Sequence, residues 1–438
     1  MPPLEVWEKV LIDLEDYSED LHAYIPCADC HGGDPDVTGL TMEDKYAAHE
    51  GVITDPSLDA EATCGNCHEN IASYQHGNLH FNLQGYDTVL YARSSPENHP
   101  VIEEGESYHC NDCHSSCGQC HVSQPTNLGG GLVSGHVFER TPSMSRQCSA
   151  CHGSRVNDEY TGAHEGLTAD VHLRQGRMVC TDCHTGDHMH GTDTDEPYDH
   201  RYDGPQVPSC EDCHQDVAGV GSGNRYHELH GTESVSCQVC HSVAYTNCFS
   251  CHLERTEDEE QLPYYRLEHD ELGFFIGRNP RRDQDRPYRY VPVRHVPTHP
   301  ELFEFYGEDV LDNFDALPTW TYATPHNIQR NTPQTEGCGA CHGNDDVFLT
   351  PDKVDPDYLR ANVDVIVPVA PPVPQSYRFT LEDIEALDAP PDPMDADPLD
   401  APPVDPLDAP PVDPLDAPPV DPLDAPIDPL DVPPPASG

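Results

Sequence analysis

The chain has 438 residues and a formal net charge of −57, from 79 acidic and 22 basic residues. This balance argues against nucleic-acid binding, because neutralising phosphates requires clustered lysines and arginines. No apolar run approaches about 18 residues, so the sequence predicts no transmembrane segment. The hydrophobic fraction of 36% lies below the globular norm of roughly 45–50%, which predicts that the polypeptide alone builds only a small apolar core.

The first predicted element is an amphipathic helix over residues 4–22, within an N-terminal segment of residues 1–26. Its apolar residues recur at three- and four-residue spacing: Leu4, Trp7, Leu11, Leu14 and Leu21. The polar face carries Glu and Asp rather than Lys and Arg, which disfavours a helix lying on a membrane surface. We therefore expect this helix to pack over the site formed by the first of the cysteine motifs that follow it.

Downstream of residue 26 the pentapeptide Cys-x-x-Cys-His occurs ten times, numbered motifs 1 to 10 in chain order. The paired cysteines are Cys27 and Cys30, Cys64 and Cys67, Cys110 and Cys113, Cys117 and Cys120, Cys148 and Cys151, Cys180 and Cys183, Cys210 and Cys213, Cys237 and Cys240, Cys248 and Cys251, and Cys338 and Cys341. The histidines that close the motifs are His31, His68, His114, His121, His152, His184, His214, His241, His252 and His342. The ten pairs use all 20 cysteines, so no thiol is left for another role.

This pentapeptide is typical of c-type haem attachment. Two thiols three positions apart reach the vinyl-derived carbons on one porphyrin edge, and the next residue's imidazole binds the iron from the proximal side. Zinc sites and redox-active Cys-x-x-Cys pairs do not require a histidine after every pair, and a disulfide framework has no reason to fix every spacing. We therefore predict ten covalently bound haem c groups.

Motifs 3 and 4 are separated only by Ser115 and Ser116. Two porphyrins attached at this spacing are held within contact range of each other. Such closeness favours electron transfer between them.

Ten proximal histidines leave 18 of the 28 as candidates for a second, distal ligand. The candidates are His22, His49, His80, His109, His136, His164, His172, His190, His227, His230, His295 and His326. His109 directly precedes Cys110 and cannot turn onto its own haem, so it is expected to serve a neighbour. Methionine, the other common distal ligand, is scarce among the motifs.

The motifs divide the chain into a nine-haem module at residues 27–252 and a segment at 253–384 that carries the tenth motif. The second segment has arginines among tyrosines and phenylalanines: Arg266, Arg278, Arg281, Arg282, Arg286, Arg289 and Arg294. These arginines either pair with haem propionates and local carboxylates or form an anion site. Residues 385–438 repeat Asp-Pro-Leu-Asp-Ala-Pro-Pro-Val, which predicts a disordered, extended acidic tail.

The chain resembles the periplasmic and cell-surface multihaem c-type cytochromes of anaerobically respiring bacteria and archaea. The resemblance covers about residues 22–342 and rests on the ten pentapeptides and the surplus of histidines. It implies a mostly irregular fold with short α-helices, little β-structure and a core built by haems. It also implies electron transfer through mostly bis-His ligated haems in anaerobic or extracellular respiration, and no catalytic residue.

Haem attachment of this kind takes place outside the cytoplasm, so we expect an exported protein that is periplasmic, cell-surface or extracellular. No basic and apolar leader follows Met1, so the leader is expected to be trimmed from this sequence or the start to be misassigned. The expected partners are redox proteins or extracellular electron acceptors.

Two other functions stay open from the sequence. One is an oxidoreductase that reduces or oxidises a small nitrogen or sulfur oxyanion at a five-coordinate haem, with His295, His299 or Tyr288 beside the arginines. The other is a homo-oligomer or filament in which one chain's histidine ligates a neighbour's haem.

Overall fold

The computed structural model describes residues 5–111, 115–125, 129–164, 166–191, 208–217, 219, 221–283 and 286–374. The predicted tail at 385–438 and two predicted haem-binding residues, Cys113 and His114, lie outside the described residues.

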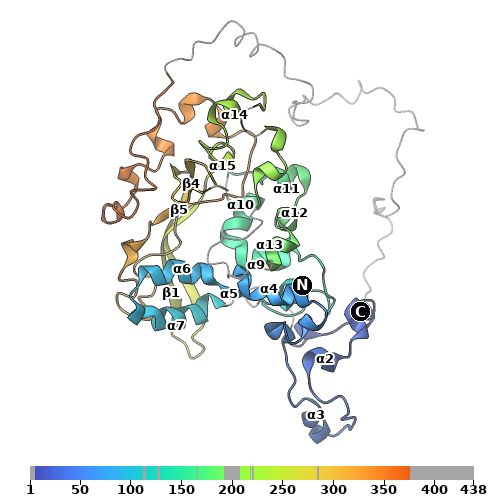
Figure 1. Ribbon diagram of the computed structural model, residues 1–438. Coiled ribbons are helices and arrows are strands. Elements are labelled where there is room, and N and C mark those ends of the chain that lie inside the picture. The colour runs from blue at the N-terminus through green and yellow to red at the C-terminus, as the bar shows by residue number, and fades with distance from the viewer. Residues whose placement is uncertain are drawn as a thin grey trace, which may run out of the picture. The chain divides into compact units, whose positions relative to one another are not determined.

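Short helices joined by irregular segments make up most of the described chain, as predicted (Figure 1). The longest is α7, His99–His109, with 11 residues. The others are α1 Leu14–Tyr17, α2 Cys27–His31, α3 Met42–Ala48, α4 Glu69–Tyr74, α5 Leu79–Asn82, α6 Gln84–Leu90, α8 Cys117–His121, α9 Ser149–His152, α10 Asp158–Thr161, α11 Val171–Gly176, α12 Cys180–Cys183, α13 Gly186–His190, α14 Arg225–His230 and α15 Cys237–His241.

Most of the motifs coincide with one turn of helix. Motifs 1, 4 and 8 are α2, α8 and α15 from first cysteine to histidine. The first three residues of motifs 2, 7 and 10 form 3₁₀ turns, Cys64–Asn66, Cys210–Asp212 and Cys338–Ala340. In a helical turn, residues three apart lie on one side, so both cysteines can face the same porphyrin edge.

The predicted N-terminal helix over residues 4–22 is wrong. The chain forms three separate turns there: a 3₁₀ turn Glu8–Val10, then α1, then a 3₁₀ turn Leu21–Tyr24. Asp13 has an extended backbone and its carboxylate accepts hydrogen bonds from the N–H groups of Glu15 and Asp16. This N-cap starts a new helix, so the turn before it cannot continue through.

Two small antiparallel sheets lie within residues 245–322. The first pairs β1 Tyr245–Arg255 with β2 Pro263–Gly273. The second has the order β3-β4-β5, from Ile276–Arg278, Tyr290–His295 and Trp320–Tyr322. Motif 9 lies in β1, where the register with β2 is irregular around Ser250. The shifts in strand register lie between Cys248 and Cys251, and the pairing on both sides of them is regular.

The buried apolar side chains concentrate in the segment with few cysteines. Three clusters hold most of them: Val291, Val293, Trp320, Tyr322, Leu349, Val354, Val365 and Ile366; Leu90, Ile102, Leu253, Leu302, Phe303, Val310, Leu311 and Phe314; and Val239, Ile276, Phe348, Val367 and Ala370. Only α6 and α7 contribute to them from before residue 239.

Around the first motif the chain exposes large apolar side chains instead. Leu21, Tyr24 and Leu40 are 84%, 87% and 92% exposed. The Arg- and aromatic-rich segment is therefore the folded polypeptide core of the protein, while the residues around motif 1 lack such a core of their own.

Candidate metal centres

All nine motif histidines that the structure describes lie opposite a second imidazole; the tenth, His114, is outside the described residues. The ring centroids of the nine pairs lie 5.9–6.3 Å apart. With the motif histidine first, the pairs are His31–His136 (5.9 Å), His68–His22 (6.3 Å), His121–His190 (6.0 Å), His152–His80 (6.1 Å), His184–His326 (6.3 Å), His214–His172 (6.0 Å), His241–His227 (6.1 Å), His252–His299 (6.0 Å) and His342–His230 (6.3 Å).

This separation fits two imidazoles that bind one metal ion from opposite sides. A metal–nitrogen bond of about 2 Å and a ring nitrogen about 1.2 Å from its centroid place the two centroids about 6 Å apart. Directly packed rings lie closer, as His22 and Phe138 do at 4.1 Å. The residues present therefore fit an iron held between paired histidines.

Hydrogen bonds at Nδ1 leave Nε2 of several paired histidines available for a metal. The Nδ1 atoms of His31, His121 and His342 lie 2.8, 2.7 and 3.0 Å from the carbonyl oxygens of Ile53, Glu139 and Pro372. A carbonyl oxygen only accepts, so each Nδ1 donates, and in the neutral imidazole Nε2 is then the nitrogen with a free lone pair. Metal-bound histidines in proteins show this arrangement.

Two distal histidines use a carboxylate instead. His22 Nδ1 lies 2.9 Å from Asp20 Oδ1, and His172 Nδ1 lies 3.0 Å from Asp170 Oδ1. The hydrogen bond to Asp170 raises the pKa of His172. A carboxylate behind an imidazole orients the ring and increases its basicity as a ligand.

Burial keeps other paired imidazoles neutral. It is the main cause that lowers the pKa of His80, His184 and His326 to about 4, and the charges of neighbouring histidines make a smaller contribution in the same direction. A metal ion needs the neutral form of histidine, so these groups require no deprotonation at neutral pH.

Eight of the twelve predicted distal candidates face a described motif histidine. They are His22, His80, His136, His172, His190, His227, His230 and His326. His227 and His230 lie three residues apart but face different motif histidines, His241 and His342 respectively.

The other four candidates have different contacts. His49 is exposed and its Nδ1 lies 2.6 Å from the Lys45 carbonyl oxygen. His109 Nε2 lies 2.8 Å from the Tyr306 hydroxyl, and His164 Nε2 lies 3.2 Å from Thr246 Oγ1. His295 packs between Phe249 and Trp320 with ring centroids 4.7 and 5.5 Å away. Among the described residues, none of these four is paired with a motif histidine.

Sequence reasoning missed His299 as a distal candidate and placed it in an anion site instead. The structure brings it opposite His252 of motif 9. The only feature of the sequence that could have indicated His299 is that it lies four residues after His295, which was named as the distal candidate instead.

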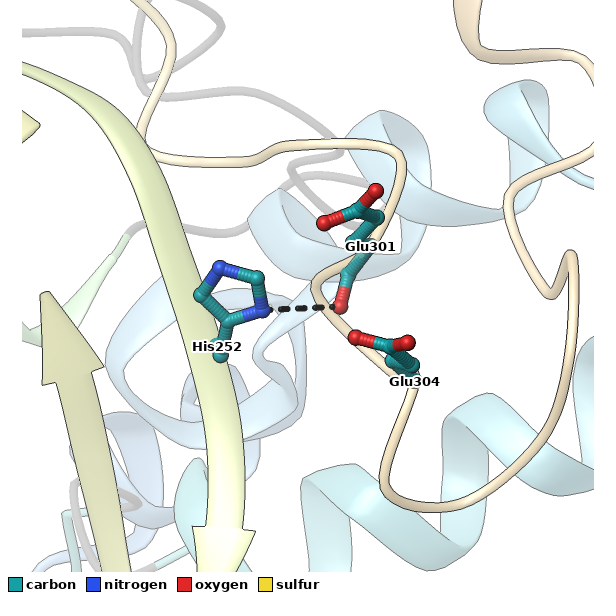
Figure 2. A group of neighbouring side chains, drawn as sticks. All are labelled: His252, Glu301 and Glu304. Carbon is teal, nitrogen blue, oxygen red and sulfur yellow. Dashed lines mark hydrogen bonds between the residues drawn. The ribbon is translucent and has the colours of Figure 1, made fainter. Parts of the chain in front are cut away.

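The surroundings of His252 contain two further potential metal ligands (Figure 2). His252, Glu301 and Glu304 each offer one ligand atom, and these atoms lie within 4.8 Å of one another. His252 Nδ1 also lies 3.2 Å from the Glu301 carbonyl oxygen, the contact marked by the dashed line. Both glutamates are exposed. Since His252 already faces His299, the glutamates are better described as an acidic rim around this centre.

The motifs are close to one another in a definite order. The side chains of Cys64 and Cys117, Cys148 and Cys180, and Cys210 and Cys237 are in hydrogen-bond contact. Four further pairs are close enough for their charges to interact: Cys30 with Cys64, Cys120 with Cys148, Cys183 with Cys213, and Cys240 with Cys341. Together these interactions, three through hydrogen bonds and four through charge, link motifs 1, 2, 4, 5, 6, 7, 8 and 10 in chain order.

Several arginines of the second segment pair with local carboxylates. Arg266 binds Glu254 and Glu268, Arg286 lies 2.5 Å from Asp283 Oδ2, and Arg294 forms a buried ion pair with Glu159. Arg266, Arg286 and Arg294 therefore pair with local carboxylates, which is one of the two roles expected from the sequence.

Comparisons with protein-family models, with curated proteins and with solved structures found no match to this chain. In the part of the chain that the structure describes, no helix is both long and apolar enough to cross a membrane. The function must therefore be argued from the paired histidines and their surroundings.

Proposed function

We propose that the chain is an exported electron-transfer protein that holds ten haem c groups. The observation that carries this proposal is the pairing of nine motif histidines with a second imidazole at 5.9–6.3 Å. In eight of the nine pairs the two histidines lie at least 42 residues apart in the sequence, while His227 and His241 are 14 apart. When bound, haem supplies an iron that changes between the ferric and ferrous states.

The contacts between motifs support a path for electrons. Closeness of the thioether-forming side chains of adjacent motifs, such as Cys148 and Cys180, would place porphyrins attached to them near each other. The linked motifs therefore run from motif 1 near the N-terminus to motif 10 in the second segment.

Exposed apolar side chains also support bound haems. Leu21 and Leu40 flank motif 1 and lack protein cover. A porphyrin is a large apolar plate, and covering such side chains with it contributes about 25 cal/mol per Å² of apolar surface removed from water. The polypeptide's part is to provide the axial imidazoles, orient them through Nδ1, and fix the distance between neighbouring centres.

The oxyanion-converting alternative has no specific support in the site. It needs an iron with one open face and free histidines beside the arginines. His299 instead faces His252, and His295 Nδ1 lies 2.9 Å from the Cys248 carbonyl oxygen. The filament alternative likewise gains no support from these nine pairs, because both members of each come from the same chain.

Mass spectrometry and electron paramagnetic resonance test the proposal together. The intact exported protein should carry ten haem masses, and its oxidised spectrum should consist of low-spin ferric signals, as bis-imidazole ligation requires. A chain without haem would refute the proposal. A large high-spin signal that shifts on adding nitrite or sulfite would favour the oxyanion-converting enzyme.

A further inference from the structure

His184, the histidine of motif 6, contacts a second histidine through its Nδ1 atom. Its Nδ1 lies 2.9 Å from Nδ1 of His188, and the two rings are stacked with centroids 4.9 Å apart and an angle of 21° between their planes. This contact is separate from the pairing of His184 with His326, whose ring centroid lies 6.3 Å away. His184 therefore has one imidazole at hydrogen-bond distance and another at the distance that fits a shared metal ion.

Other motif histidines have a backbone carbonyl oxygen at the same position. Besides the three Nδ1 contacts described above, those of His241 and His252 lie 3.2 Å from the carbonyl oxygens of Gln329 and Glu301. All five partners are peptide oxygens. An imidazole nitrogen is a far stronger base than a peptide oxygen, so His188 is a stronger hydrogen-bond acceptor than these carbonyl groups.

The direction of the hydrogen bond follows from the proposed ligation. Two Nδ1 atoms at 2.9 Å share one proton, so one ring donates and the other accepts. When His184 binds iron through Nε2, its remaining proton is on Nδ1, and His184 donates. His188 then accepts at Nδ1 and keeps its own proton on Nε2.

The short helix α13 holds His188 in this position. The helix follows Thr185, whose backbone is extended. The carbonyl oxygen of His188 accepts a hydrogen bond from Nδ2 of the buried Asn78 at 3.4 Å. Two residues later in the same helix, His190 faces His121 of motif 4. The element that carries His188 is therefore anchored at motif 4 as well as at motif 6.

We propose that His188 is a positioning residue for His184, which accepts the Nδ1 proton, orients the ring and increases the basicity of Nε2 toward iron. This inference rests on the proposed electron-transfer function. A more basic axial ligand stabilises the ferric state, so the haem at motif 6 should have a lower reduction potential than it would with a carbonyl partner. His188 acts only through His184 and is not itself a ligand.

A background variant makes the contact at motif 6 measurable on its own. His326→Gly removes the paired imidazole, so this haem should become five-coordinate with His184 as its protein ligand, while the other haems keep both imidazoles. In the reduced protein, the iron–histidine stretching band of the resonance Raman spectrum arises from five-coordinate haem. Its frequency rises as the hydrogen bond from Nδ1 strengthens. The band therefore reports the contact between His184 and His188 rather than electron-transfer activity.

Two replacements of His188 separate its role as acceptor from the space that it fills. In the His326→Gly background, His188→Leu should shift the band to lower frequency, because the Nδ1 proton of His184 loses its acceptor. His188→Gln can supply an amide oxygen, so its band should lie between those of the His188→Leu variant and the background.

The matched control is a second background, His299→Ala. There the five-coordinate haem should be the one held by His252, whose Nδ1 partner is the Glu301 carbonyl oxygen. His188→Leu should leave the band of this background unchanged.

If the His326→Gly background does not fold, the single variants of His188 provide the measurement. A potentiometric titration of His188→Leu should show one of the ten haems at a higher midpoint potential than in the wild type, and His188→Gln should show a smaller rise. The oxidised spectrum should stay low-spin, because both axial imidazoles of motif 6 are retained.

An unchanged band in His188→Leu, or unchanged potentials where only the single variants fold, would overturn the positioning role. Equal band shifts in the two backgrounds would also overturn it. A high-spin ferric signal in the single variant would do the same, because it would show that His188 is itself an iron ligand. These outcomes leave the electron-transfer proposal intact, since haem is still bound. A chain that carries no haem would instead refute the proposed function.

Discussion

His299 faces His252 across 6.0 Å between ring centroids, although no helix or repeat relates the two in sequence. His252 lies in β1, and His299 lies in the irregular segment that follows β4. The Leu253 N–H donates to the Leu302 carbonyl oxygen at 2.9 Å, so a backbone contact joins these two segments next to the pair. The pair is thus positioned by the fold of the second segment.

Replacing His299 with alanine should convert one haem from low spin to high spin. The loss of the second imidazole leaves one iron five-coordinate, and the other haems keep their ligands. Electron paramagnetic resonance of the oxidised protein should show a high-spin signal of about one iron per chain. The matched control is His49→Ala, which removes an exposed histidine with no motif partner and should leave the spectrum low-spin. A low-spin spectrum in both variants would exclude His299 as a ligand.

Replacing His109 should affect stability rather than ligation. This buried histidine has its Nε2 2.8 Å from the Tyr306 hydroxyl, and its carbonyl oxygen accepts a hydrogen bond from the Tyr265 hydroxyl at 2.5 Å. His109→Leu should lower the free energy of unfolding by about 1–3 kcal/mol, because it leaves the Tyr306 hydroxyl without this partner. Denaturant titration measures the loss. A new high-spin haem signal would show that His109 is a ligand after all.

The ion pair between Arg294 and Glu159 should be costly to break on one side only. Glu159 is 1% exposed, and its Oε2 also accepts the His326 backbone N–H at 3.0 Å. Glu159→Leu should lower the free energy of unfolding by about 3–5 kcal/mol, since it leaves the arginine charge buried without its partner. The double variant Glu159→Leu/Arg294→Met should recover much of this loss. A double variant as unstable as the single one would argue against an uncompensated charge as the cause.

Glu106 predicts a pH dependence of stability. Burial, followed by the charges of Asp87 and Glu103, raises the pKa of this glutamate from 4.5 to about 7. The folded state therefore binds more protons than the unfolded state between these two values, so stability falls as pH rises from about 4.5 to 7 and then levels. Glu106→Gln should remove this part of the pH profile and be more stable than wild type above pH 7.

The control for this change is Glu104→Gln, on the exposed side of α7. It should leave the slope of stability between pH 4.5 and 7 as in wild type. Denaturant midpoints measured across this range would show the difference. Equal slopes for wild type and Glu106→Gln would contradict the raised pKa of Glu106.

The sequence predicted which histidines lie opposite the motif histidines better than it predicted the fold of the segments between the motifs. Motif positions follow directly from cysteine spacing, and eight distal candidates were named because histidines outnumber the motifs. His299 was missed because its position depends on the backbone contact between Leu253 and Leu302, which no local pattern reveals. The helix predicted at residues 4–22 failed because periodicity does not register the capping carboxylate of Asp13.

The polypeptide core could not be placed from the sequence either. Its strands are short, and the clusters around Trp320 and Phe303 join residues from distant parts of the chain. The composition indicated that few apolar side chains are available for a core. It did not indicate that most of the buried ones lie in the cysteine-poor segment.

In the proposed haem-loaded protein, each iron held between two paired histidines would also be a cross-link between two stretches of the chain. His31 with His136 and His184 with His326 close large loops, and removing a bound metal would release both ends of such a loop. In a mature protein the folding free energy is thus tied to metal loading. If the chain carries haems as proposed, their loss should loosen the N-terminal region first, because none of the three apolar clusters of the described residues includes a side chain from before residue 90.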